Sequence, residues 1–331
     1  MDYGRIFRRA LGIMWRHKVL WLFGIAAALF SSGYGSGNAS SVAQYRMDQG
    51  DLGALGRMFP FGADFSRAIP IILAIIGAVL LFAIVLWIVG IIVRYTSLGA
   101  LIGGVDEVER TEDTTFRSSL NRGWRNLLPL FAIDLLISLA TSVVVIAIIL
   151  LAIAGGAFAL VPAIVLAGNG GSNAVAILWG LGVGLIVLVG IIAVSIIVSA
   201  IVTLVRELAF RARILENQGV FDALGGAFRL IRSRLKEVLI VWLLLVAIDL
   251  ALSVLFIPIA IIGAVGLVSP VLAALAITES VAVALIIGLP LLLFFILVTA
   301  VFGGIYLTYR STVWTLAYRE LRSDHLVAEA V

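Results

Sequence analysis

Residues 116–134 read FRSSLNRGWRNLLPLFAID, and this stretch contains the two features from which the fold can be worked out. Its first half places Phe116, Leu120 and Trp124 at steps of four, so that three apolar side chains share one face of a helix. Arginines and small polar residues occupy the opposite face, a pattern typical of a helix that lies in the membrane interface. Its second half opens a long apolar run, so the stretch predicts an interfacial helix followed by a membrane span.

The whole chain is hydrophobic enough to need lipid around it. Hydrophobic residues make up 63% of its 331 residues and charged residues 13%, whereas a typical soluble domain has about 45–50% and 25%. Several apolar runs exceed the ~20 residues that a helical span needs, and none alternates in the manner of an outer-membrane strand. These features predict an all-α integral membrane protein.

Six spans can be placed, with approximate limits 18–31, 69–93, 127–153, 174–205, 238–262 and 281–309. Excess Lys and Arg marks the cytoplasmic loops of a membrane protein. Of the 23 Lys and Arg residues, the N-terminal segment, the 94–126 loop, the 206–236 loop and the C-terminal tail carry five, five, seven and three. The remaining three lie in the first outer loop, 32–68. This distribution predicts six transmembrane helices with both termini in the cytoplasm.

The stripe at 116–124 has counterparts in two other basic segments, FRRALGIMW at 7–15 and FDALGGAF at 221–228. A span follows each stripe, and a returning span then ends at an arginine. The intervals from the first Phe of each stripe to that arginine are 87, 90 and 89 residues. We therefore expect one membrane domain, 1–331, built from three parallel two-helix repeats, each preceded by a cytoplasmic interfacial amphipathic helix; the repeats cover 3–98, 112–208 and 219–317.

The two ends of the chain carry a family resemblance. The start, MDYGRIFRRALGIMWRHKVLWLFGI, and the segment YRSTVWTLAYREL at 309–321 resemble bacterial six-span membrane proteins of uncharacterised function. The whole pattern is also similar to the membrane domain that precedes the catalytic domain of some glycerophosphodiester phosphodiesterases. The sequence contains no soluble barrel with His and acidic metal ligands. The resemblance therefore implies a membrane module of the bacterial cytoplasmic (inner) membrane and supplies no active-site residues.

Two carboxylates stand inside predicted spans. Asp134 in FAIDLLISL and Asp249 in VAIDLALSV share the pattern A-I-D-L-x-x-S, and Ala26 occupies the equivalent position of the first repeat. A charge on the lipid face costs about 2.5–3.5 kcal/mol, so we expect both acids to face protein or water. The following residues are candidate partners: Ser138 and Ser253, four positions further on, as hydrogen-bond donors, and the inner-end arginines Arg94, Arg206 and Arg310 as cations.

The role of these acids has two interpretations. They can act as a proton or cation relay, or as a substrate-binding acid inside the bundle. Alternatively, they form polar contacts that fix how the helices pack, which we regard as the better explanation. The apolar segments 152–171 and 257–277 are broken by Gly and Pro, so we expect a helix break or bend on the outer side, as a binding site or a short re-entrant hairpin. The acidic run 105–115 could hold a cation, although such a run is more often a solvated loop.

Other chemistry has little support in the sequence. The chain has no cysteine, and its two histidines, His17 and His325, lie near opposite ends. No phosphate-binding glycine loop, metal-ligand spacing or nucleophile–base pair is present, so we expect no enzyme activity and no cofactor. Basic residues are explained by cytoplasmic loops rather than by nucleic acid. The expected function is a non-enzymatic module that organises lipid or a partner membrane protein; the alternative is a transporter or channel for a small or amphiphilic solute that uses Asp134 and Asp249.

Overall fold

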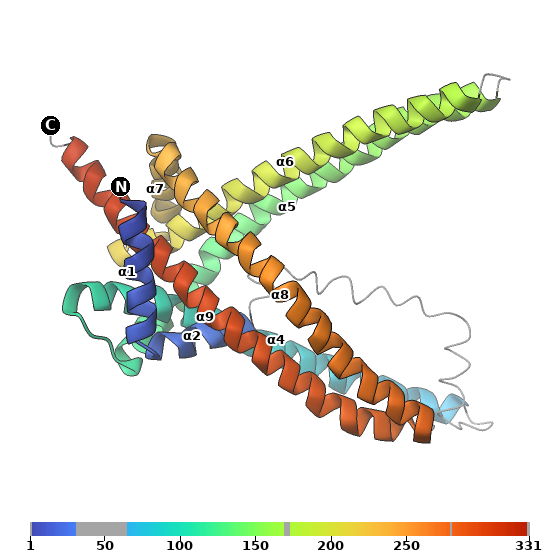
Figure 1. Ribbon diagram of the computed structural model, residues 1–331, viewed down its shortest axis with the longest axis horizontal. Helices are drawn as coiled ribbons and strands as arrows, with labels where there is room; N and C mark the ends of the chain where they lie inside the picture. The colour runs from blue at the N-terminus through green and yellow to red at the C-terminus, as the bar shows by residue number, and fades with distance from the viewer. Residues whose placement is uncertain (1, 31–64, 169–172, 279, 330–331) are drawn as a thin grey trace. The chain divides into compact units, whose positions relative to one another are not determined.

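The computed structural model describes residues 2–30, 65–168, 173–278 and 280–329, and every regular element in these ranges is an α-helix (Figure 1). The described part contains eight helices. They are α1 (Tyr3–Arg16), α2 (Val19–Leu29), α4 (Phe65–Thr111), α5 (Phe116–Gly168), α6 (Asn173–Glu216), α7 (Val220–Ser233), α8 (Leu235–Thr278) and α9 (Val281–Glu329). The expectation of an all-α protein is thus confirmed for the described residues, whereas most of the predicted outer loop, 32–68, lies outside them.

Five of these helices, α4, α5, α6, α8 and α9, are long and apolar enough to cross a membrane. Between 0% and 17% of their most apolar windows is buried within the protein, so most of these side chains face outward. Such a surface requires lipid, and it indicates a multi-pass membrane protein. Helix α2 has 11 residues and is about 16 Å long at the usual helical rise, too short to cross a bilayer by itself. A sixth crossing near 18–31 therefore stays a prediction.

The chain divides into two compact units, and each is assembled from segments that are distant in the sequence. The first unit contains Met1–Ile6, Leu128–Ala251 and Trp314–Val331, and the second contains Phe7–Leu127 and Leu252–Val313. The boundaries fall inside α1, α5, α8 and α9, so neither unit coincides with one of the expected repeats.

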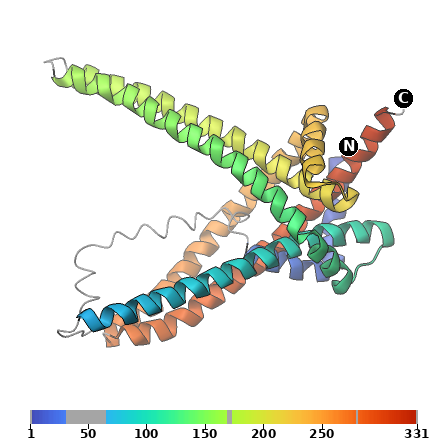
Figure 2. The same ribbon diagram turned by 180° about the vertical axis from the view of Figure 1, so that it is seen from behind.

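In the first unit, α5 and α6 lie side by side as a long antiparallel pair (Figures 1 and 2). The Phe158 and Trp179 rings are 6.3 Å apart between centroids. A Cβ added to Gly155 would meet the Val187 side chain, and one added to Gly180 would meet Ala163. Higher residue numbers on α5 thus pair with lower residue numbers on α6, which defines one continuous antiparallel register.

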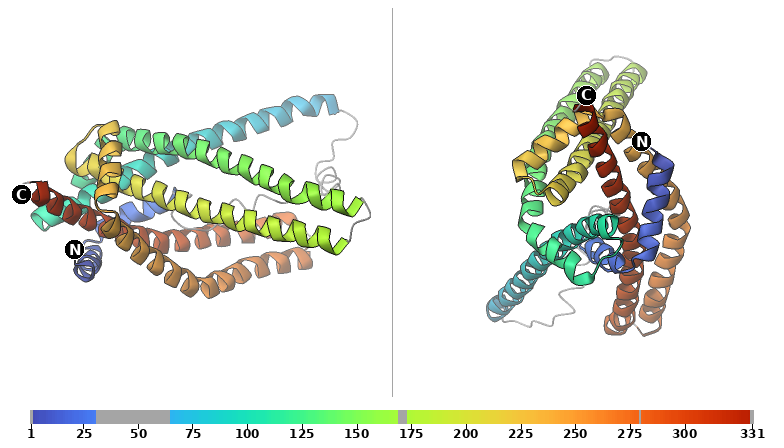
Figure 3. Two further views of the ribbon diagram at one scale, coloured as in Figure 1. Left: turned by 90° about the horizontal axis from the view of Figure 1, so that it is seen from above. Right: turned by 90° about the vertical axis from the view of Figure 1, so that its left-hand side faces the viewer.

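In the second unit, the part of α8 from Leu252 onward pairs with the first part of α9 in the same way, as the left view of Figure 3 shows. The Phe256 and Phe302 rings are 5.6 Å apart in an edge-to-face arrangement, and Phe295 fills the space beside Gly263. Edge-to-face contacts of this kind stabilise a pair by about 0.5–1.5 kcal/mol beyond the area they bury.

Helix α2 is held against α9 by a close backbone contact. A Cβ on Gly304 would overlap the backbone of Ile25, and a Cβ on Gly24 would overlap Gly304 and Thr308. The buried Thr308 hydroxyl lies 3.3 Å from the Leu20 carbonyl oxygen and donates to it across the two helices. Small residues and hydroxyl bonds are how helices associate in lipid, where apolar side chains gain nothing by leaving the surrounding acyl chains.

On three of the long helices, the buried core is concentrated just after Arg94, Arg206 and Arg310 in the sequence. On α4, nearly every residue from Tyr95 to Asp106 is buried, whereas residues 79–89 are exposed. On α6 the corresponding buried run is Glu207–Ala212, and on α9 it includes residues 311–318. Helices α4, α6 and α9 therefore each have an exposed apolar length and a packed basic end.

The expected outer break of 152–171 and 257–277 is wrong for the described residues. Helix α5 continues through Gly168 with Pro162 inside it, and α8 continues through Thr278 with Pro258 and Pro270 inside it. A proline removes one backbone hydrogen bond, and in a long helix with many others that loss does not end the helix. Neither segment forms a re-entrant hairpin in the described part.

The three apolar stripes all lie on helices. The first and third stripes fall in α1 and α7, which have 14 residues each, and the second is the start of α5, continuous with the helix that follows. Glu112 and Asn217 have positive φ angles of 60° and 54°, one residue after α4 and α6 end. A left-handed residue there is a common helix stop. Each stop precedes the first Phe of the next stripe by four residues.

The contact between α2 and α9 generates a test. Gly304→Leu is expected to lower the free energy of unfolding by about 1–3 kcal/mol, because its new side chain must displace the Ile25 backbone. The matched control is Gly182→Leu on α6, where an added Cβ meets nothing within 4 Å and leucine favours the helix. Thermal unfolding of both variants in detergent measures the difference, and equal midpoints would refute the close contact.

Candidate functional site

Asp134 and Arg206 form an ion pair between α5 and α6 in the first unit. The Asp134 side chain is 8% exposed and that of Arg206 is 25% exposed, and the Arg206 Nε lies 2.7 Å from Asp134 Oδ1. The antiparallel register that brings Gly155 to Val187 also brings Asp134 level with Arg206. The structure therefore joins one of the two predicted intramembrane acids to one of the three predicted arginines.

The other expected partners of the acids are arranged differently. Ser138 is exposed and makes no hydrogen bond within the described part of the chain, so it does not donate to Asp134. Asp249 and Ser253 both lie on α8, where Asp249 is half-buried and Ser253 is exposed. Asp249 belongs to the first unit and Ser253 to the second. A shared role for the two aspartates stays a prediction.

Arg94 and Arg310 lie in the second unit. The guanidinium carbon of Arg94 is 5.3 Å from the centre of the Tyr95 ring, a cation–π distance. Phe30, the residue after α2, lies against Gly90 of α4, and an antiparallel register continued from that contact brings Ala26 level with Arg94. At this level α2 therefore carries an alanine, where α5 carries Asp134 at the level of Arg206. Pairing of Arg94 or Arg310 with an aspartate stays a prediction.

A second group of charges beyond Arg206 was not predicted from the sequence. Arg211 is fully buried, and its guanidinium lies 2.7 Å from Glu207 Oε2 one helical turn earlier. At the end of α6, Glu216 accepts a hydrogen bond from the Tyr318 hydroxyl at 2.5 Å and pairs with Arg322 at 3.2 Å. The i,i+4 spacing of Glu207 and Arg211 could have been recognised in the sequence. The partners of Glu216 lie about 100 residues away in the chain, so no local sequence pattern could have identified them.

The two ends of the chain meet in the first unit. The Asp2 backbone N–H donates to Glu320 Oε1 at 3.2 Å, and Arg5 lies 3.6 Å from the same carboxylate. Burial, followed by the carboxylates of Glu237 and Glu320, raises the pKa of the Tyr3 hydroxyl, so this tyrosine stays neutral at physiological pH. The N- and C-terminal segments therefore lie together.

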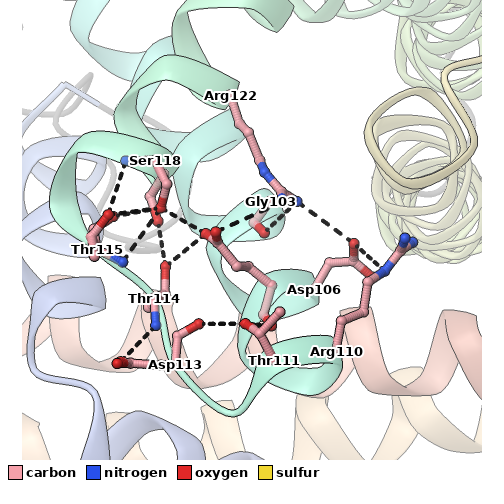
Figure 4. Close-up of polar contacts among 11 residues, drawn as sticks. Gly103, Asp106, Arg110, Thr111, Asp113, Thr114, Thr115, Ser118 and Arg122 are labelled. Carbon is pink, nitrogen blue, oxygen red and sulfur yellow. Dashed lines mark hydrogen bonds and ion pairs between the residues drawn. The ribbon is translucent and has the colours of Figure 1, made fainter.

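The acidic run 105–115 is part of the packed structure rather than a solvated loop (Figure 4). Most of it belongs to the last turns of α4, and Asp106 is 4% exposed. Asp106 pairs with Arg110 at 3.0 Å and with Arg122 at 3.8 Å. Glu107 accepts hydrogen bonds from Ser118 at 2.7 Å and from Thr114 at 3.0 Å. These oxygens are used by protein donors, so the prediction of a solvated loop is wrong, and the bonds join α4 to the start of α5.

Neither acidic cluster resembles a metal centre. Within the described ranges, no group of three or more His, Asp or Glu side chains is placed to hold a metal ion. An arginine, a hydroxyl or a backbone amide lies beside each of the carboxylates of Asp134, Glu207, Glu216, Asp106, Glu107 and Glu320. The arrangement of Asp134 and Arg206 is suited to neutralising charge inside an apolar helix pair, which removes most of the cost of leaving either group in lipid.

Long apolar helices with charges gathered at one end define the class, a helical multi-pass membrane protein. A family model described as "Family of unknown function (DUF7544)" matches residues 13–317, and the chain belongs to this family. Searches of curated proteins and of solved structures found no match. None of these comparisons supports the resemblance to the membrane domain of glycerophosphodiester phosphodiesterases.

A double-mutant cycle tests the ion pair. Arg206→Leu is expected to cost roughly 3 kcal/mol of unfolding free energy, because it leaves the Asp134 carboxylate without its partner in an apolar setting. Asp134→Leu should cost less, since the longer arginine can reach toward water when its partner is gone. The double variant should recover at least half of the larger loss, measured by unfolding in detergent micelles. Strictly additive losses would contradict coupling between the two side chains.

Proposed function

We propose that this chain is a non-enzymatic module of a bacterial cytoplasmic membrane that organises lipid or holds a partner membrane protein. The observation that carries the proposal is the separation along α4, α6 and α9 between an exposed apolar length and a packed, charged end. A transport path needs polar groups along the apolar length, and one charge pair found there, Asp134 with Arg206, is neutralised by a direct contact.

The exposed lengths offer a large surface for lipid or for another helix. The most apolar window of α6 has no buried residue, and those of α4, α5 and α9 are each 6% buried. Contiguous apolar surface beyond a few hundred Å² is a feature of membrane-facing or partner-binding proteins. Exposed aromatic residues on the three stripes, among them Trp15, Trp124 and Phe221, suit the interface at the edge of that surface.

The proposed topology has six crossings, three parallel repeats and cytoplasmic termini. Its support is the split of Lys and Arg along the sequence, together with the contacts of Asp2 and Arg5 with Glu320, since chain ends that meet fit an even number of crossings. The matching left-handed stops at Glu112 and Asn217 support a repeat. An amphipathic helix opening each repeat would lie in the cytoplasmic interface.

A transporter for a small or amphiphilic solute is the second candidate. Asp249 favours it, because an ionisable group within the apolar stretch of a membrane helix, such as this half-buried carboxylate of α8, commonly marks an ion or substrate path. In this case Asp249→Asn should leave expression unchanged and abolish solute flux in proteoliposomes, whereas Ser253→Ala should preserve it. Full flux in Asp249→Asn would remove this candidate.

Orientation can be tested with single cysteines because the native chain has none. Ser233→Cys at the end of α7 should react with an impermeant maleimide only after the inner face is opened, and Thr278→Cys at the end of α8 should react in intact cells. Ser233 lies just before the first residue of α8 and Thr278 is its last residue, so the two cysteines flank one proposed crossing and each is the control for the other. Labelling of both from the same side would contradict the proposed topology.

The proposed function predicts bound lipid or protein in fixed ratio. The full chain, extracted in polymer-bounded particles of native membrane, should carry a lipid composition different from the bulk membrane, or one membrane protein at constant stoichiometry, by mass spectrometry. Particles of an unrelated multi-pass protein of similar size, made from the same cells, give the bulk reference. A monomer surrounded by bulk lipid alone would refute the proposal.

A further inference from the structure

We infer that the groove between the end of α4 and the start of α5 binds the phosphate headgroup of an anionic phospholipid. This inference deepens the proposed function and rests on it, since it names one lipid class and one place. The groove has a volume of about 830 Å³, within the range that holds small ligands. It lies entirely within the second unit.

Two helix faces form the walls of the groove. On α4 they are Ile92, Val93, Thr96 and Ser97, and on α5 they are Arg117, Ser118, Leu120, Asn121 and Trp124, with Thr115 just before the helix. Spacings of three, four and seven residues place the α5 members on one side of that helix. The close approach of Gly123 to the backbone of Thr96 and Ala100 fixes the two faces against each other.

The groove changes from apolar to polar in one direction along both walls. Ile92 and Val93 are nearest the apolar length of α4, and Trp124 is nearest the apolar length of α5. Thr115, Arg117 and Ser118 lie toward the opposite, basic end. An amphiphile with its chain beside Ile92 and Trp124 would therefore carry its headgroup to Arg117. A soluble phosphate compound would leave the apolar part of the groove unused.

Three polar groups in the walls are available for a ligand. The exposed Arg117 guanidinium and the exposed Asn121 amide make no hydrogen bond or ion pair within the described residues. Thr96 is 6% exposed, and its hydroxyl also has no hydrogen-bond partner there. A buried hydroxyl without a partner is costly, so it marks a place where a donor or acceptor from outside is favourable.

The charge at this end of the groove favours an anion. Glu107 is a carboxylate beside the groove, 2.7 Å from Ser118, but it also accepts from Thr114 and lies 3.9 Å from Arg122 (Figure 4). Its charge is thus met by the protein, whereas that of Arg117 is not. A planar guanidinium binds phosphate oxygens in pairs, and charge-assisted bonds of this type are about twice as strong as neutral ones.

The test uses the full chain in nanodiscs of phosphatidylcholine with a small fraction of phosphatidylglycerol whose acyl chains are brominated. Bromine quenches nearby tryptophan, and the difference between wild type and Trp124→Phe isolates the Trp124 signal. Brominated phosphatidylglycerol should quench this signal at a lower mole fraction than brominated phosphatidylcholine. Equal quenching by the two lipids would overturn the inference.

Arg117→Gln should weaken the response to phosphatidylglycerol by about tenfold or more, the loss expected for a charge-assisted hydrogen bond. Arg125→Gln is the matched control, because Arg125 lies on the same helix, is exposed and unpartnered in the described part, and does not line the groove. It should lower the response no more than severalfold, through general attraction alone. Thr96→Val, of nearly equal shape, should weaken binding without loss of fold. Equal effects of the two arginine variants would show diffuse attraction and refute a site.

Added sn-glycerol 3-phosphate or inorganic phosphate should leave the quenching unchanged. Displacement of the lipid by either compound would show that the groove binds a soluble phosphate, and it would overturn the inference of a phospholipid site. The mass spectrometry of native-membrane particles detects any lipid or protein retained anywhere on the chain. It can therefore support the proposed function even if no lipid binds in this groove. Loss of the phosphatidylglycerol preference together with a normal lipid complement would therefore refute the site and leave the proposed function intact.

Discussion

Lipid removes the hydrophobic force that normally packs helices together, and this constraint explains where the described contacts lie. Apolar side chains on α4, α5, α6, α8 and α9 gain little by leaving acyl chains for each other, so long stretches of these helices stay exposed. Association then depends on close backbone approach and on polar contacts. The close approach of Gly24 to Gly304 in the second unit and the ion pair of Asp134 with Arg206 in the first are two examples.

The charged ends of the helices follow from the same constraint. Charges are inexpensive only near water, so arginines and acids gather beyond the apolar lengths, and there the buried charges lie beside opposite charges or hydrogen-bond donors that offset their desolvation. Arg211 with Glu207, Glu216 with Tyr318 and Arg322, and Asp106 with Arg110 all lie in such ends. Asp134 enters an apolar segment, and a side chain long enough to reach it, Arg206, is placed opposite. This arrangement favours a packing role for Asp134.

The amphipathic start of α5 has a second feature besides its apolar stripe. At 116–124 the apolar stripe does more than face lipid, because Leu120 and Trp124 also form one wall of a groove against α4. The polar residues between them bring Arg117 and Asn121 to the same groove. A helix that reads in the sequence as a membrane anchor can therefore present a headgroup site, provided that a second helix closes its open side.

The sequence by itself determined the class of protein, because composition and the length of apolar runs depend on neither register nor contact. It also identified Asp134 and Arg206 as candidates, since an acid and an arginine inside apolar runs are each costly alone. Pairing of the two required the structure, because the antiparallel register of α5 and α6 is set by contacts such as Gly155 with Val187. The continuity of α5 past Pro162 and the burial of Asp106 were likewise decided by neighbours distant in the chain. Local sequence records the cost of a proline or a carboxylate, and only the tertiary structure shows which group offsets it.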